Sequence, residues 1–299
     1  MSANYDQIQK SISTSLLEQL KLTLDKSWLK SQKSSYNSSS VAITSNNNYF
    51  SGLLESTTHL LDITSEHATL ALAISHKDPY VKQIITLMQT EEFVLNPLVI
   101  KILVDHVRRT GTSISYSVFD LNGNNLFHCD DVRTLYYTPQ VELLEKVQSW
   151  EFQPNFIYFD KSRDIDSQLK ECALKGTETH FSSGTKSLYG ASVFSGDKIY
   201  FAGVHSSYDR RLNLHAEMVA FISALSDGNK EISAVGLIST KFIDEVPHVC
   251  GCCRQFLSEI QLKNNKEINI YSFSFDGNKT FKISLKDYLP YMWDSGSLK

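Results

Sequence analysis

The amino-acid sequence predicts an α/β protein built from two copies of one helix–strand unit. The chain has 299 residues, of which 41% are hydrophobic and 21% charged, a composition typical of a globular protein long enough for two domains. Amphipathic helical segments alternate with short apolar segments, and this alternation recurs at a nearly constant distance along the chain. These two observations lead to the predicted fold class.

The repeat is clearest between residues 65–90 and residues 215–240, which lie at an offset of 150 residues. Each segment has the pattern of an amphipathic helix, a turn containing Asp, Gly or Pro, and an apolar strand. At the same offset, Pro97 and Pro247 each stand at the head of a second helical segment. The repeat therefore contains at least two helices and one strand.

Two further segments, 117–127 and 271–281, each predict a pair of strands around a glycine-containing turn. Upstream, NYFSGLL in the first half parallels IYFAGVH in the second. We therefore predict a duplicated unit, with one domain at 1–135 and a second at 160–299.

The two copies differ at two clusters of residues that are able to bind metals. At the offset of 150, the first copy has Ser65, Glu66 and His67 opposite His215, Ala216 and Glu217, and Ile100 and Leu103 opposite Cys250 and Cys253. The first copy is thus expected to pack aliphatic side chains where the second has thiols. Core packing, a common role of free cysteine, is therefore a weaker explanation of the thiols.

Three of the five cysteines fall within residues 250–253, which is typical of a redox pair, of metal ligands, or of packing. A redox pair would follow the first strand of a thioredoxin-like unit, and no such pattern is present. One imidazole and two thiolates match a zinc ion with one open coordination position, the mark of a catalytic zinc. Such an ion lowers the pKa of water toward neutrality, and a carboxylate two residues from the histidine is placed to move protons.

The two clusters together resemble the zinc-dependent cytidine deaminase superfamily, whose pattern is [HC]-A-E followed by P-C-x-x-C. The chain has HAE at 215–217 and CGCCRQFLSE at 250–259, and its CGxCRQF run is similar to the free-nucleoside enzymes, especially their two-domain dimeric class. The resemblance is specific over about 189–262. It implies tandem α/β/α domains, each with a mixed sheet of about five strands flanked by helices. The known two-domain enzymes have an active first copy, whereas here the first copy is the degenerate one, without zinc ligands.

Carried over by position, the resemblance assigns three zinc ligands, His215, Cys250 and Cys253. It implies that Glu217 moves protons between water, the ring nitrogen and the departing amine, and that the Ala216 amide contacts the pyrimidine carbonyl. Arg254 follows the last ligand and is expected to steady a thiolate, as residues behind a ligand set commonly do. Cys252 occupies a variable position, for which we expect a packing role.

The sequence departs from the family at several positions. Val249 replaces the proline before the first cysteine, and the nearest proline is Pro247. The nucleoside enzymes carry G-x-N-x-E, whose Asn and Glu hold the ribose hydroxyl, but here these positions are His205 and Ser207. Ser187 replaces an aromatic residue. A site that loses partners of a sugar hydroxyl loses discrimination, so free cytidine is not expected to be the preferred substrate.

Four residues ahead of the zinc histidine or at the departures are candidates for substrate binding. Arg210 and Arg211 fit a contact with a phosphate or carboxylate, or an exposed loop. Tyr208 fits stacking on a base or covering a core edge. His205 fits a hydrogen bond to a sugar or ring, or a surface position.

We therefore predict a zinc-dependent hydrolytic deaminase that acts on a cytosine-type base, nucleoside or nucleotide and releases ammonia. One alternative is deamination of another amino-heterocycle, a purine or a nucleoside antibiotic. Another is a zinc-binding protein without turnover that acts as an interaction scaffold, although the presence of Glu217 argues against it. The degenerate copy is expected to serve as a scaffold, and the resemblance implies a homodimer.

The remaining sequence features restrict location and partners. A net charge of −4 and the lack of a basic stripe disfavour nucleic acid as substrate or partner. No basic, apolar leader and no apolar run of membrane-spanning length is present, so we expect neither a signal peptide nor a membrane contact. An odd cysteine number with clustering favours a reducing cytoplasm over a disulfide-bonded protein.

Overall fold

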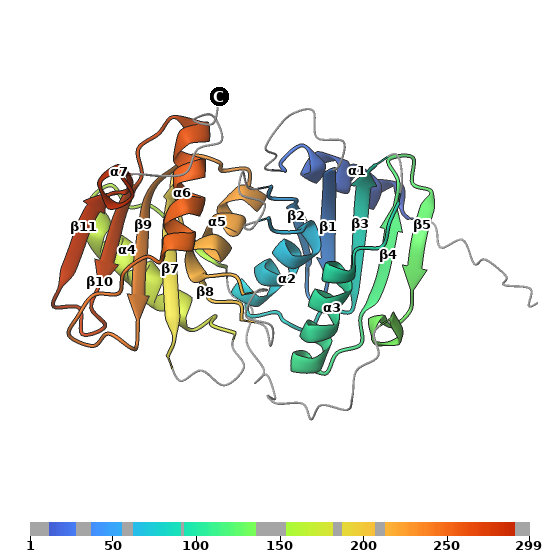
Figure 1. Cartoon of the computed structure of the whole chain (residues 1–299), viewed down its shortest axis with the longest axis horizontal. Coiled ribbons are helices and arrows are strands. Elements are labelled where there is room, and N and C mark those ends of the chain that lie inside the picture. Colours follow the sequence, from blue (N-terminus) through green and yellow to red (C-terminus); the bar gives the residue numbers. More distant parts are fainter. Residues whose placement is uncertain are drawn as a thin grey trace, which may run out of the picture.

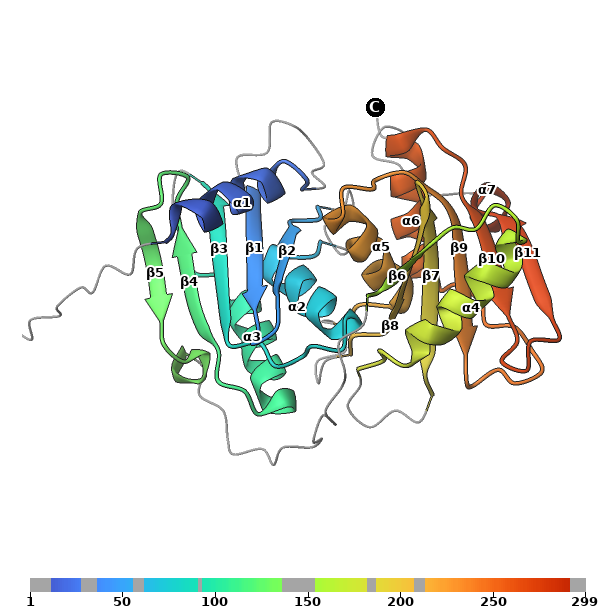
Figure 2. The ribbon, with the colours of Figure 1, turned by 180° about the vertical axis from the view of Figure 1, so that it is seen from behind.

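The computed structural model describes residues 12–27, 37–55, 62–90, 93–135, 154–181, 187–206 and 213–290. Two β-sheets lie side by side, and each has helices on both faces (Figures 1 and 2). The helices of the described part are α1 (Thr14–Leu24), α2 (Ser65–Ser75), α3 (Pro97–Thr110), α4 (Ile165–Thr177), α5 (Ala216–Ser226), α6 (Gly251–Asn264) and α7 (Leu285–Tyr288), with a 3₁₀ turn at Val132–Leu135.

The strands of the first sheet are β1 (Asn37–Ile43), β2 (Asn48–Gly52), β3 (Gln83–Gln89), β4 (Ser115–Phe119) and β5 (Asn125–Cys129). Those of the second sheet are β6 (Phe156–Tyr158), β7 (Tyr189–Ser195), β8 (Lys198–Gly203), β9 (Ile232–Ser239), β10 (Asn269–Phe273) and β11 (Thr280–Ser284).

Both sheets have the same order and the same strand directions. The first runs β2-β1-β3-β4-β5, and the second runs β8-β7-β9-β10-β11 with β6 added beyond β8. In each sheet one pair is parallel, β3 with β4 and β9 with β10, and the other pairs are antiparallel. The predicted α/β class with mixed, helix-flanked sheets is confirmed. The second sheet takes its edge strand from residues 156–158, ahead of the predicted domain start at 160.

The helix caps correct the sequence alignment of the two halves. Thr64 is the N-cap of α2 and His215 is the N-cap of α5, which gives an offset of 151 rather than 150. Glu66, not His67, therefore corresponds to Glu217. The offset of 150 was wrong because α2 is buried on every side, so its apolar pattern does not fix the register.

The second pair of helices shows a larger shift. Asn96 caps α3 and Cys250 caps α6, so Asn96 corresponds to Cys250 and Val99 to Cys253. The residues aligned from sequence, Ile100 and Leu103, lie one turn further along the helix. A shift of four residues returns a helix to nearly the same face, which is why the apolar pattern tolerated it.

Helix α4 lies directly on the backbone of β7 and β8. Three glycines, Gly176, Gly190 and Gly203, make this possible: a Cβ on any of them would overlap backbone atoms of the opposing element. For Gly203 the opposing backbone is that of His180, just beyond the end of α4. The close approach therefore brings His180 and Phe181 to the end of β8.

The two halves share one apolar core, in which α2 packs against α5 (Figure 1). Asn155 bridges these helices, because its amide nitrogen donates to Ser75 Oγ at 2.9 Å and to Ser223 Oγ at 2.7 Å. On the periphery, Lys26 Nζ donates to the Ser226 carbonyl at 3.3 Å. The halves thus meet through both apolar and polar contacts.

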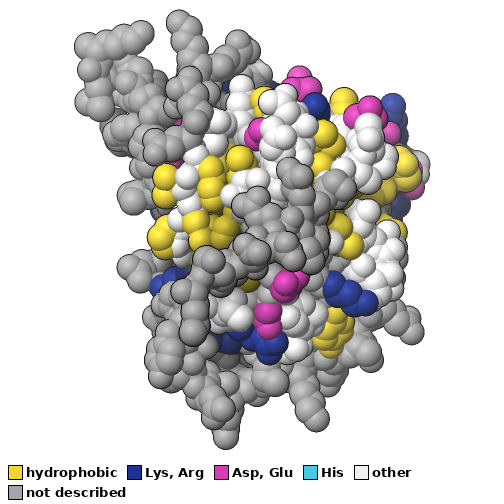
Figure 3. All heavy atoms as spheres, turned by 90° about the vertical axis from the view of Figure 1, so that its right-hand side faces the viewer, with side chains coloured by type: hydrophobic (Ala, Val, Ile, Leu, Met, Phe, Trp, Pro, Cys, Tyr) yellow, Lys and Arg dark blue, Asp and Glu magenta, His cyan; other side chains and the backbone are white. Residues whose placement is uncertain are grey.

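The face at the β5 edge of the first half carries small, separate groups of acidic and basic side chains among apolar and polar ones (Figure 3). Of the helices in the described ranges, none has both the length and the apolar character of a bilayer-spanning segment.

Candidate metal centre and pocket

Two helix N-termini meet at one point in the second half. His215 is the N-cap of α5, Cys250 is the N-cap of α6, and Cys253 lies in the first turn of α6. His215 Nδ1 lies 3.3 Å from Cys250 Sγ and 3.3 Å from Cys253 Sγ. The structure thus brings together the three ligands that the resemblance assigned.

The donor set fits zinc. A tetrahedral ion with a nitrogen at 2.0–2.1 Å and a sulfur at 2.3 Å separates these ligand atoms by about 3.5 Å, close to the separation observed. Three protein ligands of this type leave the fourth position for water or substrate. Among the residues that the structure describes, this is the single cluster of His, Cys, Asp or Glu side chains with such spacing.

The electrostatics of the cluster favour a thiolate. Hydrogen bonds from the Cys253 thiol, from His215 and from the Cys253 amide lower the pKa of Cys250 to about 3. The hydrogen bond to Cys250 in turn raises the pKa of His215. The positive end of the α6 dipole acts in the same direction, because helix N-termini stabilise anions.

Glu217 lies in the first turn of α5 and is 4% exposed. Burial, the largest cause, raises its pKa above the ordinary value. A carboxyl group with a raised pKa, beside a His/Cys cluster and at the edge of a pocket, is suited to both accept and return protons near neutral pH.

The corresponding glutamate of the first half, Glu66, has a different environment. Its Oε1 accepts hydrogen bonds from Thr86 Oγ1 at 2.8 Å and from Tyr116 OH at 2.9 Å. Ser40 Oγ extends this network through Thr86 Oγ1 at 2.7 Å. We call Ser40, Thr86 and Tyr116 the hydroxyl cage of Glu66.

The strand registers show what replaces the hydroxyl cage in the second half. Aligned on Gly52 and Gly203, the positions of Ser40, Thr86 and Tyr116 become Ala191, Leu237 and Ile270. None of these three has a side-chain hydroxyl. The strand positions that supply hydroxyl donors to Glu66 therefore supply none to Glu217.

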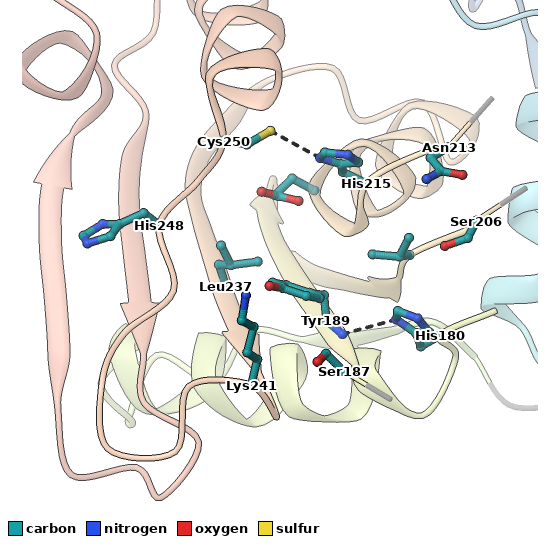
Figure 4. A pocket seen from close by; sticks show the side chains of 12 residues that line it. His180, Ser187, Tyr189, Ser206, Asn213, His215, Leu237, Lys241, His248 and Cys250 are labelled. Carbon is teal, nitrogen blue, oxygen red and sulfur yellow. Dashed lines mark hydrogen bonds between the residues drawn. The ribbon is translucent and has the colours of Figure 1, made fainter. Parts of the chain in front are cut away.

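A cavity of about 430 Å³ opens beside the cluster (Figure 4). Its volume suits a small heterocyclic ligand. Its lining residues are His180, Ser187, Tyr189, Val204, Ser206, Asn213, His215, Glu217, Leu237, Lys241, His248 and Cys250.

Several of these lining residues escaped the sequence analysis. His180 Nδ1 accepts the Tyr189 amide at 3.2 Å, so the neutral ring carries its proton on Nε2. Lys241 follows the carboxyl end of β9, where ligands of α/β sheets commonly bind. This position in the sequence pattern indicates a candidate binding residue. Asn213 precedes His215 by two residues, and His248 precedes Cys250 by two.

The structure places His205 outside the pocket. Its side chain is 4% exposed, and its ring centroid lies 5.2 Å from that of His67 and 5.8 Å from that of Phe181. Its neighbours Val204 and Ser206 line the pocket instead, because successive side chains of an extended segment point to opposite faces. This corrects the expectation that His205 binds substrate.

Arg254 also has other partners than expected. Its Nη1 donates to the Tyr288 carbonyl at 3.1 Å, and its guanidinium carbon lies 4.8 Å from the Tyr288 ring centroid. In the described ranges its side chain makes no hydrogen bond to a cysteine sulfur. Cys252, expected to pack, is exposed on α6.

The other predicted substrate contacts divide into two groups. Ala216 begins α5, where backbone amides have no intrahelical acceptor and are available to a ligand. Ser207 and Arg210, together with Tyr208 and Arg211, lie outside the described residues.

The sequence and the structure were compared with known proteins. No family model matches the sequence. Similar solved structures are cytidine deaminases, from Burkholderia pseudomallei (22% identity, 42% of this chain and 98% of that chain, TM-score 0.38) and Mycobacterium tuberculosis (20% identity, 44% and 99%, TM-score 0.36). A third is that of Mycobacterium leprae (18% identity, 43% and 99%, TM-score 0.35). Each neighbour is covered almost completely by less than half of this chain.

Proposed function

We propose that the second half is a zinc-dependent hydrolytic deaminase of a cytosine-type base, nucleoside or nucleotide. The observation that carries the proposal is the convergence of His215, Cys250 and Cys253 on one point, with the buried Glu217 beside them and a pocket open to both. Zinc held there supplies Lewis acidity and lowers the pKa of water toward neutrality.

The residues of the chain account for the proton transfers of this reaction. Hydrolysis replaces the amino group of the heterocycle by the oxygen of water, and the amino group leaves as ammonia. Glu217 takes one proton from water to the ring nitrogen and a second to the departing amine, so that it returns to its initial state. The burial of Glu217 favours this alternation, because it keeps the pKa of the carboxyl group raised. The Ala216 amide is proposed to hold the ring carbonyl.

We propose that the site does not bind a ribose hydroxyl through the Asn and Glu side chains that the nucleoside enzymes use. The position of the ribose-binding Asn is His205, which is buried against the first half. Lys241 and His248 line the pocket and carry the potential for positive charge, and they support an anionic group on the substrate. Cytidine should therefore be a poor substrate.

A screen for ammonia release from zinc-loaded protein tests the proposal. It compares cytosine, cytidine, deoxycytidine and their monophosphates with adenine and guanine derivatives. Turnover of a cytosine compound supports the proposal, and turnover of purines alone would replace it by the purine alternative. Absence of turnover with every compound would contradict it. A kcat/KM for cytidine of about 10⁴ M⁻¹s⁻¹ or more, the range of good enzymes, would contradict the substrate part.

The proposal also includes a cytoplasmic setting and a homodimer. All five cysteines are free, which supports a reducing compartment. The homodimer is implied by the family resemblance, and sedimentation of the purified chain tests it.

A further inference from the structure

The first half reaches the candidate active site through the end of α3. Arg109, in the last turn of this helix, is 2% exposed. Its guanidinium carbon lies 3.6 Å from the ring centroid of Phe181, and its Nη1 donates a hydrogen bond to the backbone carbonyl of Ser206. Asp105, one turn earlier, lies 3.7 Å from the same nitrogen. A buried cation of one half is thus bonded to the main chain of the other.

The carbonyl that Arg109 binds belongs to a wall of the pocket. Segment 204–206 is held on one side by Phe181, whose amide donates to the Val204 carbonyl at 2.8 Å and whose carbonyl accepts from the Ser206 amide at 2.7 Å. On the other side it pairs with Leu214, by hydrogen bonds of 3.0 and 2.9 Å with His205. We call segment 204–206 the pocket wall.

The pocket wall has two faces. Val204 and Ser206 face the pocket, while His205 faces the first half, with its ring 5.2 Å from His67 and 6.5 Å from His106 between centroids. The main chain that carries the pocket-facing side chains is therefore supported from behind by the first half. Arg109 makes a polar contact that crosses from the first half to this main chain, at the carbonyl of Ser206.

We propose that Arg109 is a positioning residue of the candidate active site, which fixes the pocket wall by tying the Ser206 carbonyl and the Phe181 ring to α3. The consequence for substrate rests on the proposed function, whereas the tie itself does not. A hydrogen bond from a charged donor in a buried setting is stronger than a neutral one. The planar guanidinium, unlike an ammonium, makes the stacking contact and the hydrogen bond together.

Three variants test the proposal. Arg109→Met keeps an apolar stem but removes the charge and all donors, and Arg109→Lys keeps the charge but not the planar group. Lys26→Met is the matched control, because Lys26 also donates from the first half to a carbonyl of the second, that of Ser226, which does not line the pocket. Zinc content, melting temperature, amide hydrogen exchange, and kcat and KM are measured for each full-length chain.

In Arg109→Met we expect about one zinc per chain and faster amide exchange at Phe181 and residues 204–206, by tenfold or more. We expect KM for the best substrate to rise about tenfold to a hundredfold, the range for loss of a hydrogen bond from a charged group. The change in kcat should stay within about threefold, because the wall contacts parts of the substrate that do not react. Arg109→Lys should fall between this variant and the wild type, and Lys26→Met should match the wild type in exchange and KM.

Unchanged exchange and KM in a folded Arg109→Met would overturn the proposal. A fall in kcat without a rise in KM would also overturn it, since the effect would then lie on the chemistry. Equal effects of Lys26→Met would overturn it as well, because Arg109 would then act only by holding the two halves together. If Arg109→Met does not fold, Arg109→Lys decides by the same criteria. If the wild-type protein turns over none of the compounds, the proposed function fails. The amide-exchange measurement alone then tests whether Arg109 fixes the pocket wall.

Discussion

Replacing Glu217 by Gln separates catalysis from metal binding. The substitution keeps the size of the side chain and removes its capacity to carry a proton, while His215, Cys250 and Cys253 are untouched. Among the lining residues, no second carboxyl is available as a substitute. Of the histidines that line the pocket, His180 has its Nδ1 engaged by the Tyr189 amide.

The magnitude follows from that absence of a substitute. One positioned acid–base group contributes about 10²- to 10⁴-fold, which is about 3 to 5 kcal/mol of transition-state stabilisation. Because Glu217 is proposed to serve both proton transfers, we expect kcat to fall toward the upper end of this range. Zinc content should remain near one per chain.

The assay measures ammonia release at saturating substrate, with zinc quantified on the same preparation. Glu66→Gln is the control, because it makes the same change at the corresponding residue of the first half. There the carboxylate is bound by hydroxyls, and in the described part of the chain Glu66 belongs to no cluster with the spacing of metal ligands. We expect this control to keep kcat within about twofold. Activity of Glu217→Gln within tenfold of wild type, at full zinc content, would refute the role of Glu217. Loss of activity in the Glu66 control as well would show that the effect is not local.

Three further predictions concern metal, pH and packing. Purified protein should hold about one zinc per chain, and Cys253→Ala should lower this content at least tenfold; two zinc ions per chain, by elemental analysis, would contradict the degenerate first half. Burial lowers the pKa of His67 to about 3 and of His106 to about 4, against about 6.5 in the unfolded chain. The unfolded state therefore binds more protons below pH 6.5, and the free energy of unfolding should fall between pH 6.5 and 4 by up to about 1.4 kcal/mol per pH unit for each histidine. Urea unfolding at pH 7, 6 and 5 should show a shallower dependence in His106→Gln, and equal slopes would disprove this account. Gly190→Ala places a Cβ against the Ala173 carbonyl of α4, so it should lower the free energy of unfolding by about 1–3 kcal/mol or more. A melting temperature within about 2 °C of the wild type would contradict the close approach.

The fold class and the cluster of His215, Cys250 and Cys253 were accessible from the sequence for physical reasons. Alternation of helical and extended apolar patterns predicts α/β structure, and both sheets bear it out. The cluster was accessible because few kinds of side chain bind zinc and because His215, Cys250 and Cys253 each stand at the start of a helical pattern. The structure brings these three side chains together.

The sequence was less informative about register and long-range contacts. The apolar pattern of α2 is the same on every face, so it did not reveal that Glu66 is the counterpart of Glu217. The direction of the His205 side chain follows from strand alternation after β8, which the sequence pattern contains. The contact between Arg109 and Ser206 joins residues 97 positions apart in the chain, and no local pattern encodes it.

The hydroxyl cage of Glu66 has a consequence for protein engineering. Grafting His and two Cys at Thr64, Asn96 and Val99 would copy the ligand set to the first half. The carboxylate there would still be held by Thr86 and Tyr116, and releasing it would cost about 1.5–3 kcal/mol for each hydrogen bond to a charged group. We expect such a chain to carry an inert zinc beside a reactive one, and the inert ion would be an internal standard for occupancy of the other.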